Sequence, residues 1–193
     1  MILLIGGSSH VGKTLLAQKL MERTGYPYIS LDHLKMAFIR TGMTELTVED
    51  DYEMRCWMWP FVVEWIKTAV ENEQNLIVEG CYIPAEWERS FSREYRAHIK
   101  SLFIVMSEAY IRSHFSDLAE YANAIEKRLD DSLDEERLIQ CSREFWEECK
   151  AHHVPCYVIE DAFSLEDMVK AALESDAGDT GELPCLPLRD LLQ

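Results

Sequence analysis

Residues 7–14 carry the clearest chemical pattern in the sequence. They read Gly-Ser-Ser-His-Val-Gly-Lys-Thr and match the pattern G-x-x-x-x-G-K-[ST] in full. In this pattern the glycines let the backbone wrap closely around phosphate oxygens, so that successive N–H groups point toward the anion. Lys13 adds a positive charge for the β- and γ-phosphates, and the Thr14 hydroxyl can ligate Mg²⁺. The pattern therefore predicts a binding loop for ATP and Mg²⁺. Its expected contributors are Gly7, Ser8, Ser9, His10, Val11, Gly12, Lys13 and Thr14.

The residues around this loop favour the same interpretation. Residues 2–5 are Ile-Leu-Leu-Ile, a wholly apolar run typical of a central parallel strand that is buried on both faces. From Lys13 to Thr24, leucine and methionine recur at helical spacing, and Gly25 then ends the helix. The N-terminus of such a helix has unpaired N–H groups and favours an anion. A glycine-rich turn without a ligand is the alternative, but a buried strand followed by a helix is the context that phosphate binding requires.

Two carboxylates follow expected strands and are candidates for the acceptor side of the site. Asp32 comes at the end of residues 26–31, and Glu79 comes near the end of residues 75–80. In parallel sheets, ligands bind at the carboxyl ends of the strands, where the loop also lies. Asp32 can accept a proton from an acceptor hydroxyl, and it can also cap the helix that it opens. Glu79 can hold a water on Mg²⁺ or contact the acceptor, or it can simply be exposed at a strand end.

Four basic residues are candidates for binding the transferred phosphoryl group or the acceptor. A loose phosphoryl-transfer transition state needs positive charge around its equatorial oxygens. Arg112 and Arg128 follow the fourth expected strand and can close over the γ-phosphate. For Arg112, an i,i+4 surface pair with Glu108 is the alternative. Lys35 and Arg40 can bind an anionic acceptor.

Apolar runs that behave as strands alternate with helical segments along the chain. This alternation predicts an α/β fold, a three-layer P-loop NTPase with a five-stranded parallel sheet and a helical lid. We expect a single domain over residues 1–175, with the charged helical segment 108–150 as the lid and residues 176–193 as a tail. The expected strands are residues 2–5, 26–31, 75–80, 99–106 and 155–159, and the other expected helices are residues 13–24, 32–40, 47–73, 84–97 and 165–174.

The composition bears on the kind of partner. The 193 residues include 35 Asp and Glu against 19 Lys and Arg, which gives a formal net charge of −16. Such a surface argues against nucleic acid and anionic membrane, and it favours a small ligand, although solubility alone is also an explanation. No apolar stretch is long enough for a membrane span. The six cysteines form no disulfide framework or zinc pattern, so we expect reduced thiols in a cytoplasmic protein.

The order of these motifs resembles the adenylate kinase and shikimate kinase type of P-loop kinase. Asp32-His-Leu-Lys35 resembles the Asp-x-Leu-Arg of nucleoside monophosphate kinases, with lysine in place of arginine. The strings Gly-Gly-Ser-Ser at residues 6–9 and Val-Glu-Gly at residues 78–80 are more similar to two-phosphoglycerate kinase and antibiotic-phosphorylating relatives. No Asp-Gly-Phe-Pro-Arg follows the third strand, which argues against a nucleoside monophosphate as acceptor.

The resemblance implies an ATP-dependent kinase that phosphorylates a small molecule. A GTPase-type switch would require Asn-Lys-x-Asp, and an Asp-x-x-Gly after the third strand, and neither string is present. A nucleotide-binding sensor or regulatory protein without phosphotransfer remains the alternative. It would keep Lys13 and Thr14 but would need no acceptor site.

Overall fold

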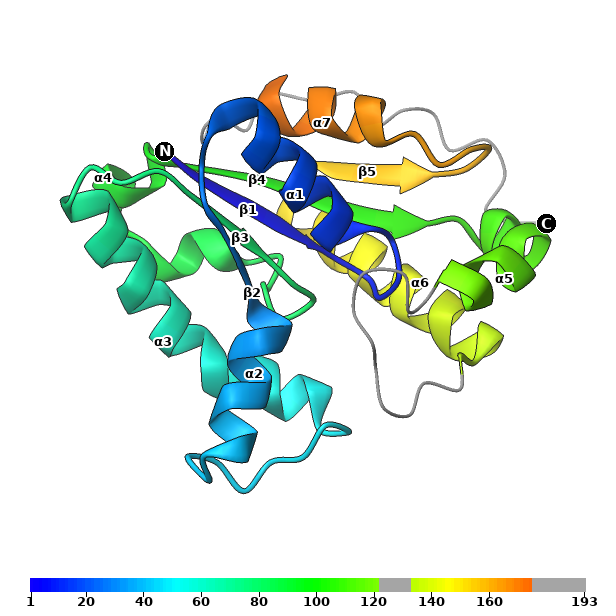
Figure 1. Ribbon diagram of the computed structural model, residues 1–193, viewed down its shortest axis with the longest axis horizontal. Coiled ribbons are helices and arrows are strands. Elements are labelled where there is room, and N and C mark those ends of the chain that lie inside the picture. Colours follow the sequence, from blue (N-terminus) through cyan, green and yellow to red (C-terminus); the bar gives the residue numbers. More distant parts are fainter. Residues whose placement is uncertain (122–132, 175–193) are drawn as a thin grey trace.

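The computed structural model describes residues 1–121 and 133–174, which form a parallel five-stranded sheet with helices on both faces (Figure 1). The strand order is β2-β3-β1-β4-β5, and each neighbouring pair is parallel. Every residue of the central strand β1 is buried, as a strand covered on both faces requires. The strands are β1 (Ile2–Gly7), β2 (Tyr28–Ser30), β3 (Leu76–Glu79), β4 (Ile99–Met106) and β5 (Cys156–Ile159).

Helices cover the two faces of the sheet as separate layers. Alternate residues of β1 belong to two core clusters: Ile2 and Leu4 pack with residues of α3 and α6, whereas Leu3 and Ile5 pack with residues of α1 and α7. This alternation follows from the two-residue period of a strand. The helices are α1 (Lys13–Thr24), α2 (Leu31–Arg40), α3 (Asp51–Glu71), α4 (Arg93–Arg96), α5 (Glu108–Tyr121), α6 (Glu135–His152) and α7 (Leu165–Glu174). The predicted three-layer fold with a five-stranded parallel sheet is therefore confirmed.

The connections place the ends of several elements at one edge of the sheet. β1 leads through the loop into α1, and β2 passes directly into α2, which runs away from the sheet before α3 returns (Figure 1). α5 follows the carboxyl end of β4 (Figure 1). Within the described ranges, no helix is long and apolar enough to cross a membrane.

The segment 84–97 differs from the single predicted helix. It forms a 3₁₀ helix, Trp87–Ser90, and the short helix α4, separated by Phe91 in an extended conformation (φ −127°, ψ 141°). Trp87 and Phe91 are both buried, and the Trp87 indole N–H donates to the Ser101 hydroxyl at 3.1 Å. Burying both rings against α3 and the sheet needs an irregular path, so packing overrides the local helical preference.

Two other segments can also be compared with the expectation. The segment 108–150, expected to be helical and charged, contains α5 and α6 on either side of residues that lie outside the described ranges. The third helix begins at Asp51 rather than near Thr47, because the Thr47 amide and hydroxyl both donate to the Asp50 carboxylate, at 2.7 Å and 2.8 Å. Thr47 therefore closes a turn before the helix instead of capping it.

Candidate active site

The loop between β1 and α1 has the backbone shape of a phosphate-binding loop. Its residues His10 (φ 62°) and Gly12 (φ 85°) both take the left-handed conformation, which turns successive N–H groups to one side. A Cβ at Gly7 (φ 117°) would lie 1.9 Å from the backbone oxygen of Ile104, so glycine is required where β1 ends beside β4. The loop then delivers the N-terminus of α1, which adds its unpaired N–H groups to the same concave backbone.

Lys13 lies against this loop as the pattern predicts. Its side chain is almost fully buried, and its ammonium donates to the Ser8 backbone oxygen at 2.6 Å. The charge is thus held at the loop itself, within reach of a phosphate that would occupy the loop.

Thr14 and Glu79 meet although they are far apart in the sequence. The Thr14 hydroxyl donates to the Glu79 carboxylate at 3.2 Å. Glu79 is fully buried, and it ends β3 in register with Ile5 of β1. A hydroxyl beside a buried carboxylate at the start of α1 is an oxygen set that suits Mg²⁺, directly or through water. The residues present therefore fit a Mg²⁺–nucleotide complex.

Helix α6 holds the loop from the side of the core. The Ser8 and Ser142 hydroxyls lie 2.8 Å apart in a buried hydrogen bond, and Ser142 also accepts from the Met106 amide at 3.4 Å. Burial raises the pKa of the Cys141 thiol, and a hydrogen bond from the Ser9 backbone N–H offsets part of that rise. Neither Ser142 nor Cys141 carried a signal in the sequence, because both sit in an ordinary amphipathic helix.

An exposed aromatic ring borders the loop on its other side. Phe163, between β5 and α7, is 42% exposed. Its ring lies so close to Gly12 that a Cβ there would approach it to 2.9 Å. A large exposed ring beside a candidate phosphate-binding loop offers a stacking surface for a nucleotide base. No motif or spacing in the sequence singles out Phe163.

Asp32 lies on the acceptor side, in the first turn of α2. It is half-buried, and within the described part of the chain its carboxylate makes no hydrogen bond or ion pair. Its negative charge acts on Cys81 and Tyr82, which follow β3. Burial, and secondarily the charge of Asp32, raises the pKa of Cys81 to about 12. Asp32 thus faces the residues after β3, at the edge of the sheet where β1 delivers the loop.

Lys35 reaches the same region but is paired with a carboxylate that the sequence did not identify. Its ammonium lies 3.3 Å from Asp51 at the start of α3, and 5.0 Å from the centre of the Tyr82 ring. The Tyr82 hydroxyl donates to the same oxygen of Asp51 at 2.9 Å, and burial chiefly raises the pKa of Tyr82. Arg137 of α6 approaches the other oxygen of Asp51 at 3.9 Å. We call Lys35, Asp51, Tyr82 and Arg137 the Asp51 cluster.

The structure places Arg40 away from Asp32. Arg40 is the last residue of α2 and is exposed. Eight residues of helix place it about 12 Å along the axis from Asp32. Its predicted contact with an acceptor stays a prediction.

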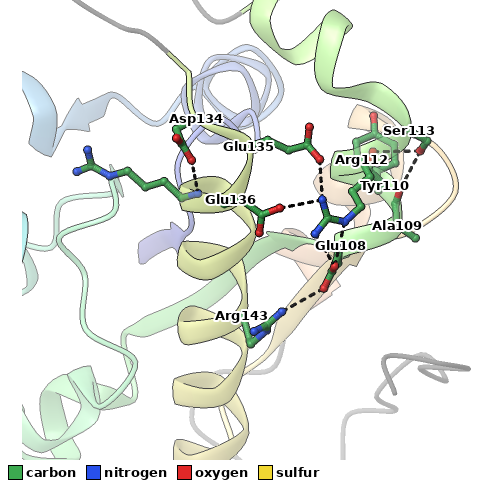
Figure 2. Close-up of polar contacts among 10 residues, drawn as sticks. Glu108, Ala109, Tyr110, Arg112, Ser113, Asp134, Glu135, Glu136 and Arg143 are labelled. Carbon is green, nitrogen blue, oxygen red and sulfur yellow. Dashed lines mark hydrogen bonds and ion pairs between the residues drawn. The ribbon is translucent and has the colours of Figure 1, made fainter. Parts of the chain in front are cut away.

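Arg112 sits among carboxylates in the first turns of α5 and α6 (Figure 2). Its guanidinium lies 2.9 Å from Glu108, Glu135 and Glu136, and hydrogen bonds to Glu136 and Glu108 raise its pKa. Arg143 also pairs with Glu108, at 3.1 Å (Figure 2). The i,i+4 pair with Glu108 is thus present, and the role of Arg112 at the γ-phosphate stays a prediction.

The remaining lid predictions fall partly outside the described ranges. Arg128 lies outside the described residues. Within 108–150, α6 contributes buried Leu138, Ile139 and Phe145 to the two core clusters, so it forms part of a layer on the sheet. A lid over 108–150 stays a prediction.

Comparison with known proteins identifies the fold. No protein-family model matches the chain, and no curated protein matches it. Among solved structures, a "putative kinase" from Chloroflexus aurantiacus is 17% identical with a TM-score of 0.53, and the match covers 90% of this chain and 97% of that one. Two structures of deoxyadenosine kinase from M. mycoides also match, each over 90% of this chain and 97% of that one. The structure with the products dCMP and a flexible dCDP is 13% identical with a TM-score of 0.51. The structure with bound dATP is 12% identical with a TM-score of 0.50. The chain has the fold of P-loop kinases.

Proposed function

We propose that the protein is an ATP-dependent kinase that transfers the γ-phosphoryl group of ATP to a small-molecule acceptor. The observation that carries the proposal is the convergence of Lys13, the Thr14–Glu79 pair and Asp32 at the carboxyl ends of β1, β3 and β2. The first two provide a donor site, and Asp32 provides a carboxylate on the acceptor side. Ligands of parallel α/β sheets bind at this edge.

Each residue has a definite task in this proposal. The loop N–H groups and the N-terminus of α1 hold the phosphates, and Lys13 contacts the β- and γ-phosphates. Thr14 would ligate Mg²⁺, with Glu79 holding it directly or through water. Bound Mg²⁺ supplies charge neutralisation for the phosphate oxygens. Asp32 accepts the proton of the acceptor hydroxyl as the oxygen attacks phosphorus, and the lack of a hydrogen bond between its carboxylate and any described residue suits that role.

The proposal extends to the setting of the reaction. We expect a cytoplasmic enzyme with nucleotide and small molecule as its partners. The five cysteines in the described ranges are all free thiols, which agrees with that expectation.

A comparison of two lysine variants tests the donor site. Lys13→Ala should weaken binding of Mg·ATP at least tenfold and abolish transfer, because the loop loses its one buried ammonium. Lys19→Ala is the matched control, since Lys19 lies on the same helix and pairs with Glu22 at the surface. Calorimetry and melting curves should show an intact fold for both. Equal ATP affinity of Lys13→Ala and the parent protein would contradict the nucleotide assignment.

A further inference from the structure

Among residues 1–121 and 133–174, the acceptor side of the site contains little free positive charge. Lys35 is the buried ammonium nearest Asp32 along α2, and its side chain is only 11% exposed. Its charge is compensated by Asp51 at 3.3 Å. Arg137, the other cation of the Asp51 cluster, also faces Asp51. The Asp51 carboxylate thus pairs with both Lys35 and Arg137 and also accepts the Tyr82 hydrogen bond.

Three other arginines of the described residues either pair with carboxylates elsewhere or lie away from Asp32. Arg55 of α3 makes two hydrogen bonds to Glu148, at 3.1 Å and 3.0 Å, which tie α3 to α6. Arg112 is surrounded by three carboxylates of α5 and α6. Arg40 lies at the far end of α2. None of the three offers an uncompensated charge beside Asp32.

An anionic acceptor would therefore meet a like charge. To reach Lys35, a phosphate or carboxylate of the acceptor would have to displace Asp51. The displaced carboxylate would then lie close to the new anion, and the Tyr82 hydroxyl would lose its acceptor. Like charges a few ångströms apart in a half-buried site repel strongly. A hydroxyl or ammonium group of an acceptor, by contrast, can donate to Asp32 and Asp51 without breaking the Lys35 pair.

We infer that the acceptor is a hydroxyl compound without phosphate or carboxylate groups, neutral or cationic, and that Asp51 is the residue that excludes anions. The inference rests on the proposed function and names its substrate class. In the reaction, the acceptor oxygen forms a bond to the γ-phosphorus, the bond from phosphorus to the β–γ bridging oxygen breaks, and the hydroxyl proton passes to Asp32. ADP leaves with the electron pair of the broken bond. Asp51 positions Lys35 and selects the acceptor; it takes no proton.

Anion binding to the nucleotide-loaded protein tests this inference without knowledge of the acceptor. The protein is first saturated with Mg²⁺ and a non-hydrolysable ATP analogue, so that the loop is filled, and it is then titrated with inorganic sulfate by calorimetry. The parent protein should bind sulfate only weakly on the acceptor side. Asp51→Asn should gain at least tenfold in sulfate affinity, because Lys35 and Arg137 become available. The double variant Asp51→Asn/Lys35→Met should lose that gain, which locates the anion.

Asp50→Asn is the matched control. It removes the same charge one residue earlier, where the carboxylate binds Thr47 outside the cluster. It should leave sulfate affinity as in the parent protein. If Asp51→Asn does not fold, Lys35→Met in the parent background decides, since it should change sulfate affinity little.

The outcomes separate the two proposals. Failure to bind the Mg²⁺–analogue complex would overturn the proposed function, and this inference with it. The inference alone would be overturned if the parent protein binds the analogue normally and also binds sulfate tightly, and if Lys35→Met abolishes that sulfate binding. Asp51→Asn with no gain over Asp50→Asn would remove Asp51 from the role of excluding anions.

Discussion

Asp32→Asn separates the chemistry of the acceptor side from its structure. The change keeps the shape of the side chain and removes its proton-accepting charge. Because Asp32 makes no hydrogen bond or ion pair within the described part of the chain, the variant loses no native contact. The effect on the free energy of unfolding should be within about 0.5 kcal/mol, as for other substitutions that break no contact. Asparagine also serves well near a helix N-terminus.

The expected loss lies in the rate of transfer. A positioned general base contributes on the order of 10² to 10⁴ in rate, or roughly 3 to 5 kcal/mol of barrier. In the proposed function ATP binds at the loop, where Lys13 contacts Ser8 and Thr14 contacts Glu79, so the affinity for ATP should stay close to that of the parent protein. The result should be a lower kcat with little change in the KM for ATP.

Three measurements on one preparation assess this prediction. Melting curves report the fold, calorimetry with a non-hydrolysable ATP analogue reports the donor site, and transfer of label from ATP reports catalysis. Full activity of Asp32→Asn would refute the assignment of Asp32 as base and make Glu79 the next candidate. Loss of the folded state would show that Asp32 serves mainly as a structural residue of α2.

Three other residues, Ser142, Phe163 and Cys81, give the remaining four predictions. Ser142→Ala should lower the free energy of unfolding by about 1 kcal/mol, because the buried Ser8 hydroxyl loses its hydrogen-bond partner at 2.8 Å. The melting temperature should fall accordingly. An unchanged melting temperature would mean that the loop does not depend on α6. Phe163→Ala should weaken ATP binding roughly tenfold in calorimetry, with Phe163→Tyr as the conservative control, and equal affinity of all three proteins would exclude a stacking role. The pKa of Cys81 is raised from its ordinary value of 9.0 to about 12, so at pH 8 about one Cys81 thiol in ten thousand is ionised. Cys81 should therefore resist iodoacetamide at pH 8, whereas the exposed Cys56 should react. Peptide mass spectrometry distinguishes the two cysteines. The raised pKa of Cys81 means that the folded state favours the protonated thiol. The resulting contribution to the free energy of unfolding should be complete below pH 9 and be lost as the pH rises toward 12. A melting temperature that rises between pH 9 and pH 12 would contradict this direction.

The sequence is sufficient to propose the donor site because its residues are adjacent in the chain. Residues 7–14 carry both glycines, the lysine and the threonine in one continuous loop, so no long-range contact is needed to recognise them. Asp32 and Glu79 could also be placed, since parallel strands bring their carboxyl ends to one edge of the sheet. The structure adds the direct Thr14–Glu79 contact, for which only the general position was expected.

The partners from α3 and α6 could not be predicted. Asp51 reaches Lys35 across 16 positions, and Ser142 reaches Ser8 across 134. Such contacts depend on how helices pack on the sheet, and helix periodicity fixes only which side is apolar. The same limit explains the segment 84–97, where burial of Trp87 and Phe91 broke a helix that local preference favoured.

Transfer of label from [γ-³²P]ATP tests the central claim most directly. The protein, Mg²⁺ and ATP are incubated with a panel of neutral, cationic and anionic hydroxyl compounds, alongside an ATP-only control and the Lys13→Ala variant. We predict a labelled product from at least one neutral or cationic compound, formed at a rate well above release of phosphate in the ATP-only control, and none with Lys13→Ala. Tight binding of Mg·ATP without transfer to any compound would contradict the kinase assignment and favour a nucleotide-binding regulatory protein.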